Sequence, residues 1–320
     1  MRQEATFPEP LRPELEPLVN RLDAAVVGNR ALMKFLVMAL LAEGHVLLDD
    51  VPGVGKTTLA KTLAQSLALT YRRIQCTPDL LPSDITGVTI FHPGTRAFEF
   101  RPGPIFAQLV LADEINRASP RTQSALLEVM EEAQVTVDGT THALEAPFLL
   151  VATQNPVEYE GTFPLPESQL DRFLVRLRVG YPTIDEETQL LGRAQGLGDA
   201  APVLARSALV EMIAQTRTVH VAESLRRYMA ELAYATRHSP HLSLGMSPRA
   251  TLALYRASQA WAFLHDRAYV IPDDVIAVAP AVVEHRLRLA RNAARNHPDL
   301  VHDVFRAILE EVRVPARERA

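Results

Sequence analysis

Residues 47–59 read Leu47-Leu48-Asp49-Asp50-Val51-Pro52-Gly53-Val54-Gly55-Lys56-Thr57-Thr58-Leu59, and this stretch decides the fold. The apolar run Val46 to Leu48 favours a buried strand, and a helical pattern begins at Lys56. The two glycines between them let backbone N–H groups close on phosphate oxygens, at a helix N-terminus whose dipole favours negative charge. A strand, a glycine loop and a helix in this order predict a phosphate-binding loop for a nucleoside triphosphate.

The residue types in this loop suit a nucleotide with its Mg²⁺ ion. Lys56 is placed to reach the terminal phosphates, and the hydroxyl of Thr57 is placed to bind the metal. Asp50 stands where the G-x-x-x-x-G-K-[ST] pattern has its first glycine, and we expect this charge to affect how tightly the nucleotide binds. A chance loop between a strand and a helix is the alternative. The predicted contacts in the loop are Pro52, Gly53, Val54, Gly55, Lys56, Thr57 and Thr58.

Length and composition limit the classes of protein that fit. The 320 residues suggest two domains, and 48% hydrophobic with 22% charged residues is ordinary for a globular protein. The longest apolar run, Phe35 to Ala42, is too short to cross a bilayer, and the acidic N-terminus does not read as a signal peptide. The single cysteine, Cys76, excludes an internal disulfide, so we expect cytoplasmic residence. A net charge of −5 argues against binding mainly to nucleic-acid phosphates.

The apolar pattern divides the chain into four parts. Residues 1–16 predict an N-terminal tail, 17–182 a nucleotide-binding domain, 183–315 a helical domain and 316–320 a C-terminal tail. Continuous apolar runs in the second part predict parallel strands covered by helices on both faces, with ligands at the carboxyl ends of the strands. The expected strands cover residues 45–48, 71–76, 109–112, 148–153 and 174–179.

Two segments within the nucleotide-binding domain alternate in the manner of β-hairpins. Residues 134–144 alternate around Asp138-Gly139, and residues 85–100 alternate around a turn at 92–95. Each could be a surface decoration. In a ring-shaped assembly, hairpins on one face would instead contact whatever occupies the pore.

Two other features bear on ligands. Val27 and Gly28 form a short apolar turn between two predicted helices, and a turn held near the phosphate loop could contact the base of the nucleotide. Near the C-terminus, an arginine cluster predicts a solvated helical face rather than a surface for nucleic acid, given the acidic total. Its members are Arg286, Arg288, Arg291 and Arg295.

A nucleotide site also needs a second metal contact and a base. The apolar run of residues 109–112 delivers Asp113 and Glu114 to the end of a strand, which we expect to lie beside the phosphate loop. Asp113 would hold Mg²⁺ through its waters, and Glu114 would orient and deprotonate the attacking water. An acidic turn that caps a helix is the alternative for this pair taken alone.

Three more polar residues are candidates for sensing the γ-phosphate. Asn155 ends the next apolar strand, where an amide could hydrogen-bond the phosphate or the water. Arg249 follows Ser247-Pro248, which reads as a helix start, so the helix dipole disfavours this cation by about 0.3–1 kcal/mol unless an anion is near. Arg172 precedes the last strand and could reach the phosphate of a neighbouring subunit, or pair with Asp171 or Glu167. For Arg249 the alternatives are a solvated arginine or a surface pair with an acidic neighbour, and for Asn155 an ordinary Asn-Pro turn.

These residues, taken together, closely resemble the MoxR family of AAA+ ATPases, from about Val19 to Val312. The resemblance rests on motifs far more specific than a phosphate loop. They are Thr77-Pro78-Asp79-Leu80-Leu81-Pro82-Ser83-Asp84, Gly103-Pro104-Ile105-Phe106, Asp113-Glu114-Ile115-Asn116-Arg117-Ala118, residues 122–132, residues 165–173 and Ser247-Pro248-Arg249-Ala250.

The resemblance implies an α/β fold, namely an AAA+ αβα core with a parallel sheet, followed by a smaller all-α lid. It implies a hexameric ring that hydrolyses ATP with Mg²⁺ at subunit interfaces. In that family's terms Asn155 is sensor 1, Arg249 is sensor 2 on the lid, and Arg172 is the arginine finger acting on the neighbour's ATP. Arg176 and Arg178 lie close enough in sequence to be alternative fingers.

The function that the resemblance implies is chaperone-like remodelling or activation of partner proteins, often together with von Willebrand A domain proteins. Closure of the lid around ATP would be the switch, with Arg249 of the same chain and the neighbour's Arg172 sensing the γ-phosphate. The first alternative is a DNA-acting AAA+ motor, because related branches with similar inserts move DNA. The second is an ATP-dependent switch that binds partners without significant turnover.

Overall fold

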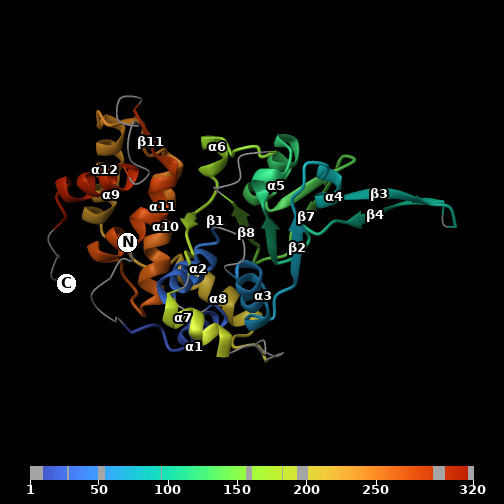
Figure 1. Ribbon diagram of the computed structural model, residues 1–320, viewed down its shortest axis with the longest axis horizontal. Helices are drawn as coiled ribbons and strands as arrows, with labels where there is room; N and C mark the ends of the chain where they lie inside the picture. The colour runs from blue at the N-terminus through green and yellow to red at the C-terminus, as the bar shows by residue number, and fades with distance from the viewer. Residues whose placement is uncertain are drawn as a thin grey trace.

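The computed structural model describes residues 10–26, 29–49, 55–94, 96–155, 161–181, 183–192, 201–290 and 300–315. Its centre is a five-stranded sheet in the order β2-β5-β8-β1-β9, and every neighbouring pair is parallel (Figure 1). The strands are β1 (Val46–Asp49), β2 (Tyr71–Gln75), β5 (Leu109–Asp113), β8 (Leu149–Gln154) and β9 (Val175–Leu177). The five predicted strands are therefore confirmed to within two residues at each end.

Helices cover both faces of the sheet, as the apolar runs predict. Alternate residues of one strand face opposite layers, because side chains of a strand point to alternate sides. Leu109 and Leu111 join the apolar cluster of α1 (Glu16–Ala25), α2 (Arg30–Leu41) and α3 (Lys56–Ser66), whereas Val110 and Ala112 join that of α5 (Pro120–Glu132). The predicted αβα core is confirmed.

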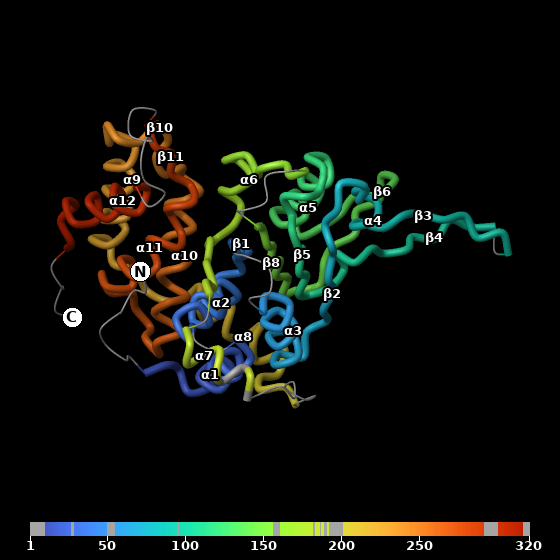
Figure 2. The backbone as a smooth tube through the Cα atoms, viewed as in Figure 1, coloured from blue at the N-terminus to red at the C-terminus, as the bar shows by residue number. Residues whose placement is uncertain are grey.

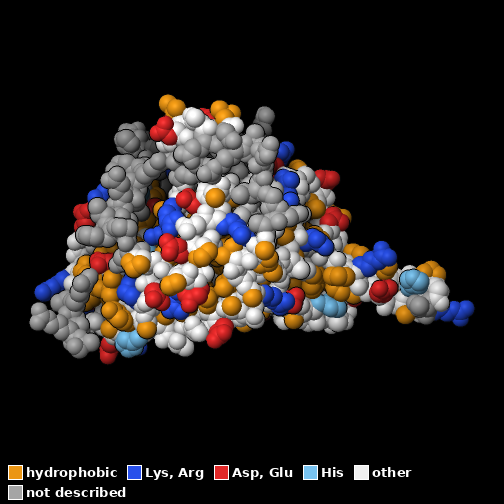
Figure 3. Space-filling model, turned by 90° about the horizontal axis from the view of Figure 1, so that it is seen from below, with side chains coloured by type: hydrophobic (Ala, Val, Ile, Leu, Met, Phe, Trp, Pro, Cys, Tyr) orange, Lys and Arg blue, Asp and Glu red, His pale blue; other side chains and the backbone are white. Residues whose placement is uncertain are grey.

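Both predicted hairpins are present. The tighter one, β6 (Gln134–Val137) with β7 (Thr140–Ala143), turns at Asp138 and Gly139, whose φ angles of 48° and 79° give the turn a twist that matches the strands. The longer one follows the short helix α4 (Pro82–Thr86) and consists of β3 (Gly87–His92) and β4 (Ala97–Pro102). It projects well beyond the body of the molecule, with basic and histidine side chains near its end (Figures 1 and 3).

The C-terminal part forms a helical lid that packs against the sheet domain (Figure 2). One continuous apolar cluster joins its helices to α2 and β9, and Arg12 near the N-terminus donates its backbone N–H to Leu264 O at 2.8 Å. No helix in the described ranges is both long and apolar enough to cross a membrane. The remaining elements of the chain are α6 (Glu167–Leu170) and a 3₁₀ turn at Ile115–Arg117 in the sheet domain, and, after β9, α7 (Ile184–Gly192), α8 (Arg206–Thr216), α9 (Glu223–His238), β10 (Leu242–Leu244), α10 (Pro248–Leu264), α11 (Pro272–Val283), a 3₁₀ turn at Glu284–Arg286, β11 (Arg288–Leu289) and α12 (Leu300–Glu311).

Within the described residues, Arg286 and Arg288 do not form the solvated helical face that the sequence predicts. The side chain of Arg286 is 3% exposed, its Nε lies 2.9 Å from Asp171 Oδ1, and it donates to Phe173 O at 2.6 Å. Arg288 lies in β11 and pairs with Glu167 at 2.6 Å. Burial lowers the pKa of Arg286 to about 10, against the opposing effect of Asp171, so it remains a cation at neutral pH. Arg291 and Arg295 lie outside the described residues.

Candidate functional site at the carboxyl edge of the sheet

The carboxyl ends of the strands meet at one edge of the sheet, where the sequence places the nucleotide. In β1, Asp49 is opposite Gln154 of β8, and in β8, Ala152 is opposite Ala112 of β5. The strand that carries Asp113 is therefore not the immediate neighbour of the strand before the phosphate loop, which corrects our expectation. Two strand spacings, about 10 Å, separate β5 from β1, and β8 fills the gap.

The described end of the phosphate loop has the conformation that its glycine allows. Gly55 has a φ of 85°, which favours glycine, and a Cβ there would lie 3.2 Å from Cγ2 of Val26. Lys56 and Thr57 then begin α3, and both are partly buried, whereas Thr58 is exposed. The contact with Val26 places the end of α1 beside this loop. The predicted contacts Val27, Gly28, Pro52, Gly53 and Val54, and also Asp50, lie outside the described residues.

Asp113 ends β5 between two partners from the neighbouring strands. Thr153 of β8 donates its hydroxyl to Oδ1 at 2.6 Å, and Arg73 of β2 binds Oδ2 at 2.6 Å. The side chain of Asp113 is 13% exposed. This carboxylate is thus fixed in orientation yet still reaches the surface of the sheet edge.

Glu114 takes an unusual backbone conformation for a residue with a side chain, with a φ of 58°. The turn aims its carboxylate back across the end of the sheet, where Gln75 of β2 donates to Oε2 at 3.1 Å and Arg117 lies 3.4 Å away. Its backbone N–H donates to the hydroxyl of Thr153 at 2.9 Å. Glu114 and Asp113 are therefore held as one unit by Thr153.

Three of these partners, Arg73, Gln75 and Thr153, were not singled out from the sequence. The sequence indicates part of this arrangement, because Arg73 and Gln75 are two residues apart at the end of an expected strand and so share one face. It does not indicate the order of the strands, which places β2 beside β5. Next to them, burial followed by the charges of Asp113 and Glu114 raises the pKa of the Cys76 thiol to about 12.

Asn155 directly follows β8, the strand that pairs with β5. It is buried, and its backbone carbonyl accepts from Asn116 Nδ2 at 3.4 Å. The residue before it, Gln154, donates to Oδ1 of the buried Asp49 at 3.1 Å.

Arg176 and Arg178, the alternative fingers, bind a carboxylate of their own chain. Asp49 pairs with Arg176 and lies 3.5 Å from Nε of Arg178. Its side chain is fully buried, so its charge requires partners of this kind. Arg176 therefore has a structural role at this edge of the sheet.

The two predicted phosphate-sensing arginines lie together, but at the other edge of the sheet. Arg172 contacts Glu131 Oε2 at 3.1 Å and donates to Leu127 O at 2.8 Å, and Arg249 pairs with the other oxygen of Glu131. Ser247 caps α10 as predicted, with its hydroxyl accepting from Ala250 N at 3.0 Å. The anion that the misplaced Arg249 requires is, within this chain, Glu131.

His45 shows that this group lies at the amino edge. It precedes β1, its Nε2 donates to Met130 O at 3.0 Å, and its Nδ1 accepts from Leu150 N at 3.0 Å at the start of β8. Met130 is the residue before Glu131, and Leu174 N, two residues after Arg172, donates to His45 O at 2.9 Å. The length of a five-residue strand, about 16 Å, therefore separates Glu131 from Asp113.

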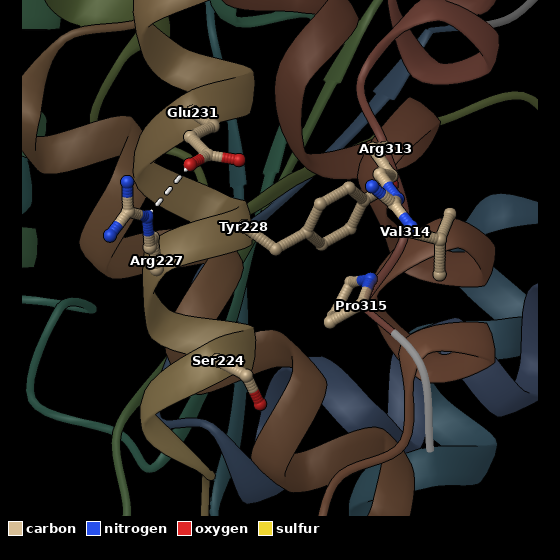
Figure 4. Close-up of a pocket in the computed structure, with 7 residues that line it drawn as sticks. All are labelled: Ser224, Arg227, Tyr228, Glu231, Arg313, Val314 and Pro315. Atoms are coloured by element: carbon tan, nitrogen blue, oxygen red, sulfur yellow. Dashed lines mark hydrogen bonds and ion pairs between the residues drawn. The ribbon is translucent and has the colours of Figure 1, made fainter. Parts of the chain in front are cut away.

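A separate shallow groove lies on the lid, between α9 and the segment that follows α12 (Figure 4). Its volume is about 330 Å³, and Tyr228 and Arg313 are among its lining residues. It shares no residue with the predicted nucleotide site, and the described residues contain no group of three or more His, Cys, Asp or Glu side chains that could hold a metal.

Comparison with known proteins agrees with this fold. The family model described as "ATPase family associated with various cellular activities (AAA)" matches residues 45–175, and the AAA lid domain matches residues 234–308. The chain is 47% identical to the uncharacterized protein YeaC of Bacillus subtilis over 98% of this chain and 99% of that protein. It is 41% identical to Chaperone MoxR1 of Mycobacterium tuberculosis, over 94% of this chain and 82% of that one.

Two further relatives extend the comparison. Protein MoxR of Paracoccus denitrificans is 32% identical over 92% of this chain and 94% of its own length. A crystal structure of a "putative ATPase" from Cytophaga hutchinsonii superimposes with a TM-score of 0.86, at 35% identity and with 95% of each chain covered.

Proposed function

This chain belongs to the MoxR family of AAA+ ATPases and is an ATP hydrolase, and we propose that it hydrolyses ATP at the interfaces between subunits of a hexameric ring. The observation that carries this proposal is the separation of the two arginines from the carboxylates. Arg172 and Arg249 meet at Glu131 on the amino edge, about a strand length from Asp113 and Glu114. Arginines so placed cannot serve the phosphates of their own chain without rearrangement of the core, but they can serve those of an adjacent subunit.

The residues at the carboxyl edge fit ATP and Mg²⁺ in their chemistry. The N-terminus of α3, with Lys56 at its first position, suits phosphate oxygens, and the Thr57 hydroxyl and Asp113 carboxylate are oxygen donors of the kind that Mg²⁺ prefers. Bound Mg²⁺ would neutralise charge on the β- and γ-phosphates. Arg73 binds Asp113 in this structure, and it would give up part of this contact when Mg²⁺ binds the carboxylate.

The remaining residues take roles set by their positions. Glu114 would accept the proton of the attacking water, once its carboxylate leaves Gln75 and Arg117. Asn155, at the end of the neighbouring strand, would orient that water or the γ-phosphate. Arg172 and Arg249 of the adjacent subunit would stabilise the charge that develops on the transferred phosphoryl group.

Mixed rings test whether hydrolysis needs two subunits. Arg172→Ala should lose about 10³-fold in kcat while it keeps ATP binding, because its own phosphate loop is intact. Glu114→Gln should also be inactive, yet it retains both arginines. A mixture of the two should regain activity at interfaces that join an intact Glu114 to an intact Arg172. If mixed rings stay as inactive as the separate variants, the proposal of hydrolysis across the interface is wrong.

We further propose that the work done is remodelling of a protein client, alone or through a von Willebrand A domain partner. The support is that one relative of high coverage is named a chaperone. The chain also presents a projecting hairpin with exposed Phe91 and Phe98, whose ring centroids are 5.4 Å apart. Affinity capture with Glu114→Gln in ATP should retain a protein that is absent in ADP. Retention of nothing but DNA, with DNA-stimulated turnover in the wild type, would favour a DNA motor instead.

A further inference from the structure

Glu131, in the last turn of α5, joins the two arginines and has no part in the reaction described so far. Its Oε2 lies 3.1 Å from Arg172, and its Oε1 pairs with Arg249. The three side chains are 26%, 28% and 49% exposed, so the group can be reached from solvent. Glu131 brings together residues from α5, from the segment before β9 and from the lid.

The charges around this group leave it short of negative charge. Two carboxylates, Glu131 and Asp171, face three cations, Arg172, Arg249 and Arg286. Asp171 is engaged by Arg286 at 2.9 Å and accepts from the hydroxyl of Ser247 at 2.9 Å. Glu131 therefore balances one of the two guanidinium groups that it holds, and the pair still attracts an anion of higher charge, such as a terminal phosphate.

The backbone around Glu131 fixes where the two guanidinium groups can lie. Arg172 also donates to Leu127 O at 2.8 Å, one turn earlier on the same helix. Arg249 lies in the first turn of α10, where the helix dipole repels a cation. Ser247 fixes this turn, because its hydroxyl caps the helix and also donates to Asp171. Two like charges and an unfavourable dipole would drive Arg249 away from Arg172 if the carboxylate were absent.

We propose that Glu131 is a positioning residue, whose carboxylate holds Arg172 and Arg249 side by side so that both meet the terminal phosphate of the ATP bound by the adjacent subunit. The inference rests on the proposed hydrolysis across the interface. It adds that the two arginines act as one preorganised pair, rather than as two independent contacts. Preorganised cations need less rearrangement when charge develops in the transition state, which raises kcat.

Removal of the charge of Glu131 is the direct test. Glu131→Gln keeps the size of the side chain and should lower kcat about tenfold, the effect of a lost charge-assisted hydrogen bond. Binding of a fluorescent ATP analogue should be unchanged, since the phosphate loop of the variant is intact. Glu131→Asp keeps the charge on a shorter side chain and should retain more activity than Gln. The matched control is Glu132→Gln at the next, exposed position, which should behave as the wild type.

Mixing identifies the side of the interface on which Glu131 acts. Glu131→Gln mixed with Glu114→Gln should regain activity, because the latter supplies an intact arginine pair. Glu131→Gln mixed with Arg172→Ala should regain none, because both defects lie on the same side. In the Arg172→Ala background, the further change Glu131→Gln should have little additional effect, since the pair is already broken.

These outcomes separate the two proposals. If Arg172→Ala with Glu114→Gln shows no recovery, interface hydrolysis itself fails. If that mixture recovers while Glu131→Gln has unchanged or higher kcat, the positioning role of Glu131 is wrong and interface hydrolysis stands. Equal and independent losses for Glu131→Gln and Arg172→Ala would likewise overturn the idea of a preorganised pair.

Discussion

At the carboxyl edge of the sheet the two candidate metal and base carboxylates are partly exposed, whereas at the amino edge most polar groups are buried and hydrogen-bonded to backbone carbonyls. Asp113 and Glu114 have side chains 13% and 26% exposed and are bound by arginine and amide side chains. His45, His285 and Arg286 are 8% exposed or less, and each donates to a carbonyl oxygen. The first edge can exchange partners for a ligand, and the second fixes the strands and the lid.

The group around Glu131 is the exception at the amino edge, because its members are partly exposed. It lies where the lid meets the segment before β9, and the buried bonds beneath it set its position. Arg286 and Ser247 attach the lid to Asp171, one residue before Arg172. The amino edge thus presents the charged side chains of the Glu131 group to solvent, while the carboxyl edge holds the two carboxylates predicted to act on the nucleotide.

The largest expected effect is at the carboxyl edge. Glu114→Gln should lower kcat by about 10³-fold, because it removes the base while leaving the shape of the site. Its ATP affinity should stay within a few-fold of the wild type, since Lys56 and Asp113 are retained. Turnover and binding measured on one preparation check both statements, and full turnover would show that Glu114 is not the base.

At the amino edge, loss of one member of a buried ion pair should act on stability instead. Arg286→Met should lower the free energy of unfolding by about 3–5 kcal/mol, because Asp171 loses its buried partner. The matched control is Arg288→Met, which removes an exposed pair with Glu167 and should cost less than about 1 kcal/mol. Denaturant unfolding measures both changes, and similar values would contradict the distinction between the edges.

Sequence patterns predicted the five strands and both hairpins because these depend on local signals, the apolar runs and the Asp138-Gly139 turn. The order of the strands is not local, so the place of β8 between β1 and β5 could not be predicted. The burial of Arg286 was missed for a related reason, since a 3₁₀ turn and a two-residue strand carry no recognisable period.

The candidate site was predictable to the same extent. Asp113, Glu114 and Asn155 follow apolar strands, and their meeting at one edge follows from a parallel sheet. Arg172 and Arg249 were recognised singly, but their common partner Glu131 depends on how the lid packs. That packing joins parts of the chain far apart in sequence, and no local pattern encodes it.

Acid should lower the free energy of unfolding through the buried histidines of the amino edge. Burial lowers the pKa of His45 to about 4, below its ordinary value of 6.5, so the unfolded chain binds a proton that the folded chain does not between these values. Neutral His45 therefore contributes on the order of 3 kcal/mol to the free energy of unfolding. This contribution is complete above pH 6.5 and is lost as pH falls to about 4. Burial also lowers the pKa of His285, which acts in the same direction.

The comparison of pH–stability curves isolates this effect. In His45→Gln the group that titrates is absent. The free energy of unfolding of the wild type should therefore approach that of the variant as pH falls from 6.5 to 4. Chemical unfolding at several pH values gives both curves. A difference that is constant over this range would show that His45 does not titrate as described.

The smallest expected effect tests whether the carboxyl edge also has a structural part. Thr153 is fully buried and joins Asp113 to the backbone N–H of Glu114, at 2.6 and 2.9 Å. Thr153→Val keeps the shape but leaves that N–H without its partner, which should cost about 1–3 kcal/mol of stability. The turn that holds Glu114 at a φ of 58° should relax with it, so kcat should fall more than ATP affinity. Thr136→Val on the exposed hairpin, where the hydroxyl meets Thr141 at 3.1 Å, is the matched control and should change neither. A loss of stability without a loss of kcat would mean that Thr153 serves only the fold. The residues that stabilise the carboxyl edge would then be distinct from those that act in hydrolysis.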